Sequence, residues 1–97
     1  MLSIHEDDIP KMSKIFRALG NDVRLKILLL VSESRKPLHI KAVADALNMD
    51  YAALYRHVKV LQRSGVVEIF EVGRSRVVSL KNRELIERLT EITNKMV

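Results

Sequence analysis

The sequence of 97 residues contains no cysteine and no tryptophan, and its aromatic side chains are two tyrosines and two phenylalanines. Without cysteine the chain can form no disulfide bond, no thiolate zinc site and no cysteine nucleophile. The scarcity of aromatic side chains argues against sheets of the RNA-recognition or oligosaccharide-binding type, because these need aromatic platforms on which bases stack.

Long hydrophobic runs are also missing. The longest apolar run covers only residues 27–31, whereas a membrane-spanning helix needs about 20 apolar residues. The acidic residues Glu6, Asp7 and Asp8 stand where a signal peptide would carry a basic segment and an apolar stretch. We therefore expect a cytoplasmic protein that has no membrane partner.

Signatures of catalysis are equally sparse. The histidines His5, His39 and His57 are scattered along the chain, and no glycine-rich phosphate loop is present. Paired carboxylates occur only at residues 6–8, where they suit the positive end of a helix dipole. We expect no enzyme activity, no catalytic residues, no cofactor and no bound metal.

What the chain does have is positive charge. Seventeen Lys and Arg against twelve Asp and Glu give a net charge of +5, with a pI near 9.8. Arg56, Lys59 and Arg63 lie within residues 51–64, a segment without any acidic residue. A basic surface of this kind attracts polyanions, nucleic acid first among them. The length predicts one domain over residues 1–97.

The first part of the chain has helical periodicity. Apolar residues at steps of three and four predict a helix from Pro10 that ends at Gly20-Asn21 in a left-handed cap. We expect Asp22 to cap a second helix, which is apolar over a broad face and ends at residues 35–37.

A short third helix is predicted over residues 40–47, followed by a tight turn. In that turn Asn48 tolerates a positive φ, and Asp50 is a favourable N-cap for a fourth helix over about 51–64. Leu54, Val58 and Leu61 fall on one side of this fourth helix and form its expected core face.

The period then changes from helix to strand. Residues 66–72 and 76–80 are rich in β-branched side chains and flank a glycine turn, which predicts a hairpin. The chain becomes helical again from Asn82. Three helices, a turn, a fourth helix, a hairpin and a last helix predict an α+β, mainly helical fold: a winged helix-turn-helix domain.

This fold indicates a surface for double-stranded DNA. The fourth helix would enter the major groove as a recognition helix, while the hairpin (about 66–80) would touch the backbone or minor groove as a wing. The alternatives are an ordinary solvated basic face and loop arginines that serve only solubility. The residues expected at the DNA are Tyr51, Ala52, Ala53, Tyr55, Arg56, His57, Lys59, Arg63, Arg74 and Arg76.

The two end helices carry heptad-like apolar stripes. A thin core accounts for part of these stripes, and the remainder favours a homodimer formed through both end helices. The expected interface residues are Ile9, Met12, Phe16, Leu85, Leu89, Ile92 and Met96.

Several of these segments resemble one family. Residues 18–28 (ALGNDVRLKIL) are similar to the opening signature LGDPTRLRIL of ArsR-type, or arsenic-repressor-like, regulators, and residues 43–47 (VADAL) are similar to their LAEAL. Residues 55–61 (YRHVKVL) resemble SRHLKVL, and residues 72–80 resemble the wing. The resemblance implies a dimeric, sequence-specific transcriptional regulator, usually a repressor, whose fourth helix docks in the major groove.

The sequence also departs from the family. Metal-sensing members have Cys-x-Cys at the start of the third helix, where this chain has His39 and Lys41 around Ile40. The last helix has glutamates but no histidine. Thiolate sensing is therefore excluded, and we expect no metal site.

The recognition helix departs as well, because tyrosines and alanines replace the small hydroxyl residues that the family often has there. The target sequence therefore cannot be carried over from the family, and the sequence points to no particular effector. Two other functions stay open: a winged-helix module that binds an acidic protein, and a chromatin-type DNA binder without a preferred site.

Overall fold

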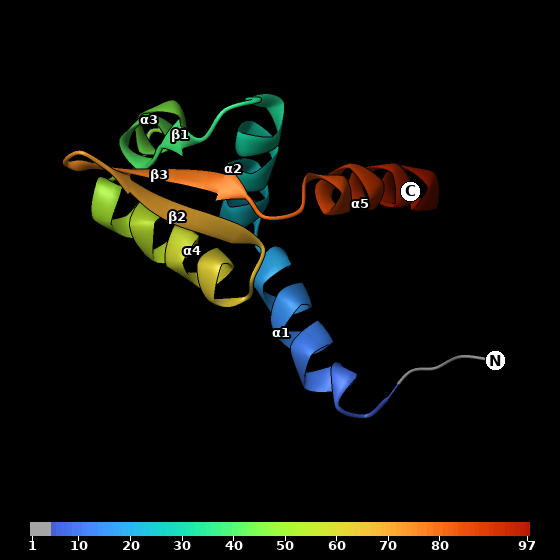
Figure 1. The fold of residues 1–97 in the computed structure, drawn as a ribbon. Coiled ribbons are helices and arrows are strands. Elements are labelled where there is room, and N and C mark those ends of the chain that lie inside the picture. The colour runs from blue at the N-terminus through green and yellow to red at the C-terminus, as the bar shows by residue number, and fades with distance from the viewer. Residues whose placement is uncertain (1–4) are drawn as a thin grey trace.

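Over residues 5–97, which the computed structural model describes, the chain forms five helices and a three-stranded antiparallel sheet (Figure 1). The predicted α+β winged helix-turn-helix fold is thereby confirmed. In chain order the elements are α1 (Asp8–Leu19), α2 (Asp22–Glu33), β1 (Leu38–His39), α3 (Ile40–Ala46), α4 (Tyr51–Arg63), β2 (Val67–Val72), β3 (Ser75–Leu80) and α5 (Arg83–Met96). Of the helices, α2, α3 and α4 pack against the sheet (Figure 1).

The helix-turn-helix has the local chemistry that its residues predict. Asn48 has a φ of 54°, the left-handed conformation that allows a tight turn. Asp50 is the N-cap of α4, and its Oδ2 accepts hydrogen bonds from the backbone N–H groups of Ala52 (3.1 Å) and Ala53 (3.3 Å). The turn and the cap together set the direction in which α4 leaves α3.

The link between α1 and α2 differs from the prediction. Gly20 has a φ of −81° and Asn21 a φ of −152°, so the expected left-handed cap is wrong. Asn21 is instead the N-cap of α2, where its side chain accepts from the N–H of Arg24, and Asp22 is the first residue of the helix. Only two residues separate the helices, so the second of them has to cap the next one.

The strand β1 was not predicted. Leu38 pairs with Val78 and His39 with Val77, which places β1 along the free edge of the hairpin. Two residues are too few to show a period, and the pairing depends on a strand that lies about 40 positions later in the chain.

The hairpin itself is confirmed, with β2 and β3 paired from Val67↔Leu80 to Val72↔Ser75. A two-residue turn, Gly73-Arg74, joins the strands, and Gly73 takes a φ of 62°. Glycine at the first turn position is typical of a type II′ turn, whose twist matches that of the strands. The turn leaves Arg74 at the exposed tip.

The core lies between α4, α2, α3 and the sheet. Leu54, Val58 and Leu61 of α4 are fully buried, as predicted, against a cluster that includes Ile27 of α2 and Val78 of β3. Within residues 5–97 every buried residue is apolar. None of the helices in that range is long and apolar enough to cross a membrane.

The end helices are attached to this core at one end only. α1 contributes the buried side chains Ala18 and Leu19 from its last turn, and α5 contributes Ile86 from its first turn. The remaining lengths project from the body in different directions (Figure 1). Arg83 anchors the start of α5 by donating to the carbonyl oxygens of Ser32 and Ser34, at the end of α2.

The cap of α4 leads to a stability prediction. Replacing Asp50 with alanine removes the acceptor for two backbone N–H groups and should lower the free energy of unfolding by about 1 kcal/mol. Urea denaturation measures the change. Asp50→Asn keeps an oxygen acceptor and should lose less; equal losses in the two variants would contradict the role given to the cap.

Candidate nucleic-acid interface

The candidate DNA-binding surface begins with the outer face of α4. Because the buried stripe occupies one side of the helix, Arg56 and Arg63 are turned to the solvent, and Lys59 is half-buried between them. At the start of the helix Tyr51 and Ala52 are exposed, while Ala53 and Tyr55 are half-buried. Most of the residues predicted on α4 thus lie on one accessible side of it.

The wing is joined to the start of α4 by stacked side chains. The rings of Tyr51 and Tyr55 stack with centroids 5.9 Å apart and an angle of 11° between their planes. The guanidinium carbon of Arg76 lies 4.9 Å from the centroid of the Tyr55 ring, a cation–π contact. The two tyrosines and Arg76, predicted separately as DNA contacts, therefore form one cluster that holds the wing against α4.

Arg76 is held by charge as well. Its Nε lies 4.0 Å from Oε1 of Glu71 on the neighbouring strand. Hydrogen bonding to the Tyr51 side chain, followed by the tyrosine and glutamate charges, raises the pKa of Arg76 above its already high value. Like any arginine, Arg76 stays protonated, and it is held by an ion pair, whereas Arg74 at the tip lies free of any ion pair among the described residues.

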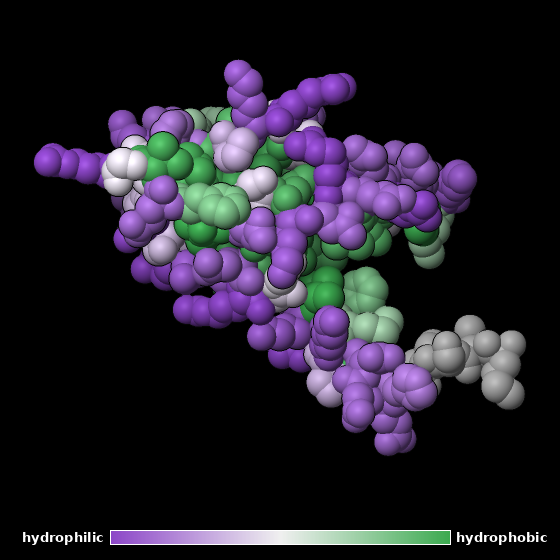
Figure 2. Space-filling model, viewed as in Figure 1, coloured by the Kyte–Doolittle hydropathy of each residue, from purple (hydrophilic) through white to green (hydrophobic). Residues whose placement is uncertain are grey.

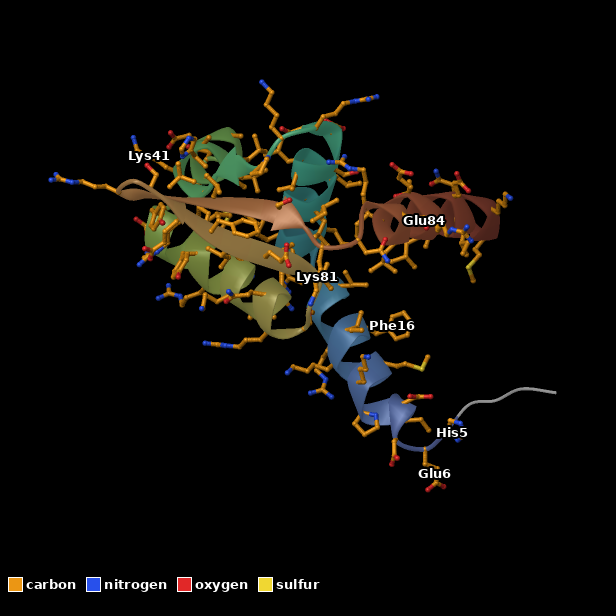
Figure 3. The ribbon with its side chains drawn as sticks, viewed as in Figure 1. His5, Glu6, Phe16, Lys41, Lys81 and Glu84 are labelled. Carbon is orange, nitrogen blue, oxygen red and sulfur yellow. The ribbon has the colours of Figure 1, made fainter. Side chains whose placement is uncertain are left out.

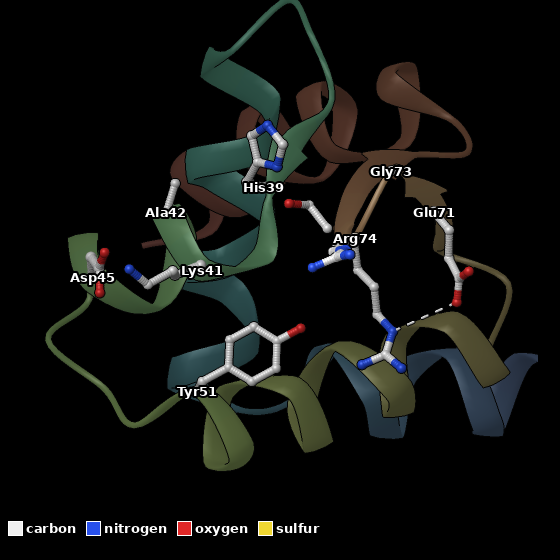
Figure 4. A pocket seen from close by; sticks show the side chains of 10 residues that line it. His39, Lys41, Ala42, Asp45, Tyr51, Glu71, Gly73 and Arg74 are labelled. Atoms are coloured by element: carbon white, nitrogen blue, oxygen red, sulfur yellow. Dashed lines mark ion pairs between the residues drawn. The ribbon is translucent and has the colours of Figure 1, made fainter.

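A cleft of about 700 Å³ opens between α3, the first turn of α4 and the wing (Figure 4). Lys41 lines it from α3 and Arg74 from the wing, while Asp45 and Glu71 add negative charge. Lys41 is not among the predicted DNA contacts, since its sequence context marks it only as a departure from the Cys-x-Cys motif. Its place beside the tip depends on the packing of α3 against β3, which no local pattern reports.

His57 differs from its neighbours on α4. It is half-buried, and its Nδ1 lies 3.2 Å from Nη1 of Arg24 on α2. A guanidinium can only donate, so Nδ1 accepts and the ring proton belongs on Nε2. Burial, and then the charges of Arg24 and Arg56, hold the pKa of His57 below its usual value.

Arg24 is itself fixed by the end of α1. Its Nε donates to the carbonyl oxygen of Ala18 (2.6 Å) and its Nη2 to that of Arg17 (3.2 Å). These are carbonyls in the last turn of α1, which lack partners inside the helix. One side chain thus connects α1, α2 and α4.

The predicted interface residues of the end helices fall into two groups. Ile9, Met12 and Phe16 of α1 are exposed, as are Ile92 and Met96 of α5, with Phe16 at 57% and Ile92 at 53%. Phe16 points away from α1 on the side where α5 projects (Figure 3), and green hydrophobic surface gathers where α1 leaves the body (Figure 2).

The second group is Leu85 and Leu89, which are half-buried and pack against the chain's own core beside Ile86. They lie on the part of α5 that contacts the body, so these two leucines also contribute to the hydrophobic core of their own chain. Of the four predicted interface residues on α5, only Ile92 and Met96, in its later part, are exposed and can contact a partner.

No group of three or more histidine, aspartate and glutamate side chains in the described part of the chain is arranged to hold a metal ion. Glu84 on α5, one of the glutamates without a histidine beside it, pairs instead with Arg88, whose Nη2 lies 2.6 Å from Oε1.

Comparison with known proteins gives one family and a consistent fold. A family model described as "Helix-turn-helix domain" matches residues 19–69, and no curated protein matches the sequence significantly. Among solved structures, a homodimeric winged helix-turn-helix DNA-binding domain from Mycobacterium bovis, a possible ArsR-family transcriptional regulator, has a TM-score of 0.86 at 19% identity and covers 99% of this chain and 93% of its own.

Two further structures have the same fold. HlyU from Vibrio cholerae has a TM-score of 0.79 at 23% identity, over 91% of this chain and 97% of its own. The transcriptional repressor BigR from Xylella fastidiosa has a TM-score of 0.72 at 19% identity, over 90% of both chains.

The environment of His57 predicts a dependence of stability on pH. Because the pKa of His57 is lower in the folded state, the unfolded chain binds the proton more readily. The free energy of unfolding should therefore fall as the pH drops below about 6.5, the usual histidine value. Urea denaturation at about pH 7.5 and about pH 5.5 measures the loss.

His57→Asn is the matched control, since it keeps an acceptor near Arg24 but does not titrate. This variant should lose less stability on acidification than the wild type. The same loss in both proteins would show that His57 does not cause it.

Proposed function

The chain belongs to the helix-turn-helix domain family and has the winged fold of ArsR-type regulators, and from this premise we propose that it is a sequence-specific regulator of transcription. It binds double-stranded DNA as a homodimer and acts as a repressor. The proposal includes no metal, cofactor or catalytic step, and a regulator of this kind works in the cytoplasm, where it reaches the chromosome.

One observation carries the proposal: the basic outer face of α4 stands next to a wing with two arginines, and Tyr51, Tyr55 and Arg76 lock the two together. A helix fits the roughly 12 Å major groove, and a wing beside it reaches the adjoining backbone or minor groove. A stacked cluster between them supports joint docking of helix and wing, because neither moves without breaking it.

Two other functions make different predictions. A module that binds an acidic protein should bind duplex DNA only weakly, whereas a regulator should bind it tightly at low salt and lose affinity steeply as salt rises. A chromatin-type binder should enrich no motif when bound fragments are selected from a genomic pool. Enrichment of one motif supports the regulator over both alternatives.

Arg56 and Arg74 should contact different parts of the DNA: Arg56 a base edge and Arg74 the backbone. Arg56 is exposed in the first half of α4, from where a guanidinium can bond O6 and N7 of guanine. Arg56→Ala should cost about 1–3 kcal/mol on the selected site and much less on a scrambled one. Arg74→Ala should weaken both DNAs alike and reduce the salt slope by about one per protomer.

Titrations of both variants on both DNAs across a salt series measure these effects. If Arg56→Ala loses the same affinity on the two sequences, Arg56 is a backbone contact and does not read bases.

The homodimer is proposed to form through the exposed apolar residues of α1 and α5. Phe16→Glu or Ile92→Glu should give a monomer, because an unpaired charge buried in the interface costs several kcal/mol. Sedimentation measures the mass. Phe70→Glu, on the exposed hairpin face, is the control and should leave the dimer intact; a monomeric wild type at micromolar concentration would overturn the proposal.

A further inference from the structure

A second hollow, of about 290 Å³, lies between the second half of α1 and the C-terminal half of α4. Its lining contains four cationic side chains and no carboxylate, in contrast to the cleft beside the wing. The cations come from α1, α2 and α4, and both α1 and α2 pack against α4. They are Lys14 and Arg17 of α1, Arg24 of α2 and Arg63 of α4.

Two of these cations are held in place by uncharged partners. Arg24 donates to two carbonyl oxygens of α1 and to His57, and Arg17 donates to Oγ of Ser13 at 3.0 Å. A guanidinium has five N–H donors, so both keep donors to spare. Across residues 5–97 none of the four forms an ion pair with a carboxylate. Four like charges around a small space repel one another, and an anion placed among them relieves that repulsion.

The position of the hollow on α4 identifies the anion. Arg63 lies seven residues beyond Arg56, which is about 10 Å along the helix axis. The major groove is about 12 Å wide, so a helix whose first turns read base edges meets the sugar-phosphate backbone near its other end. The hollow lies at that other end of α4.

We infer that this basic hollow binds a backbone phosphate at the edge of the major groove that α4 enters. The inference rests on the proposed function, and it adds Lys14, Arg17 and Arg24 to the residues that position the protein on DNA. Such a contact fixes the depth and register of α4 in the groove without reading the sequence.

The test neutralises the two hollow residues that lie on α1. In Lys14→Gln/Arg17→Gln, affinity should fall by the same factor on a selected site and a scrambled one, and the slope of log K against log salt should decrease by about one per protomer. Neither residue supplies a buried side chain, and thermal unfolding checks that the variant is folded.

Arg35→Gln/Lys36→Gln removes the same charge from the turn after α2, which lies across the molecule from α4 (Figure 1), and should leave the slope unchanged. Ethylation of single phosphates should reveal one phosphate whose modification weakens the wild type and not the hollow variant. If the hollow variant keeps the wild-type slope and ethylation pattern, the inference is wrong while the proposed function stands. If the wild type fails to bind DNA at low salt, the proposed function itself is wrong, and the inference with it.

Discussion

Leu54, Val58 and Leu61 remove one face of α4 completely from water, and α1, α2, α3 and β2 all pack against this helix. Burial of each such side chain contributes about 1.5–3 kcal/mol, which is large beside the net stability of a small domain. The helix therefore cannot rotate without exposing its core stripe. Because the stripe fixes the inner face, it also fixes which residues face outward, and the basic surface follows from the apolar one.

Polar contacts then fix the orientation of the elements around α4 that have few buried side chains of their own. The guanidinium of Arg24 satisfies the last carbonyls of α1 and touches His57, so α1 leaves the body at a defined angle even though only Ala18 and Leu19 of that helix are buried. Arg83 likewise fixes the start of α5, because it donates to the carbonyl oxygens of Ser32 and Ser34 at the end of α2. Tyr55 and Arg76 hold the wing. Each contact orders a charged side chain without a buried ion pair, which avoids the cost of desolvating two charges.

The positive charges and the exposed apolar side chains lie on different parts of the molecule. Cations lie at the wing tip, along the outer face of α4 and in the hollow beside α1, so they follow α4 from its first turn to its last. The exposed apolar residues of α1 and α5 lie on the parts of those helices that extend beyond the core. A partner that covered these parts would leave the basic surface free, which is what a DNA-binding dimer requires.

The sequence by itself determined the order of the five helices and the hairpin, the turn at Asn48, the cap at Asp50 and the outward face of α4, because each depends on residues within a few positions of one another. Packing between distant segments decided the rest. It added β1 to the sheet, turned Leu85 and Leu89 toward the core and His57 toward Arg24, and brought the cations of three helices around one hollow. A periodic pattern specifies which face of an element avoids water, but it does not specify which neighbour will cover that face.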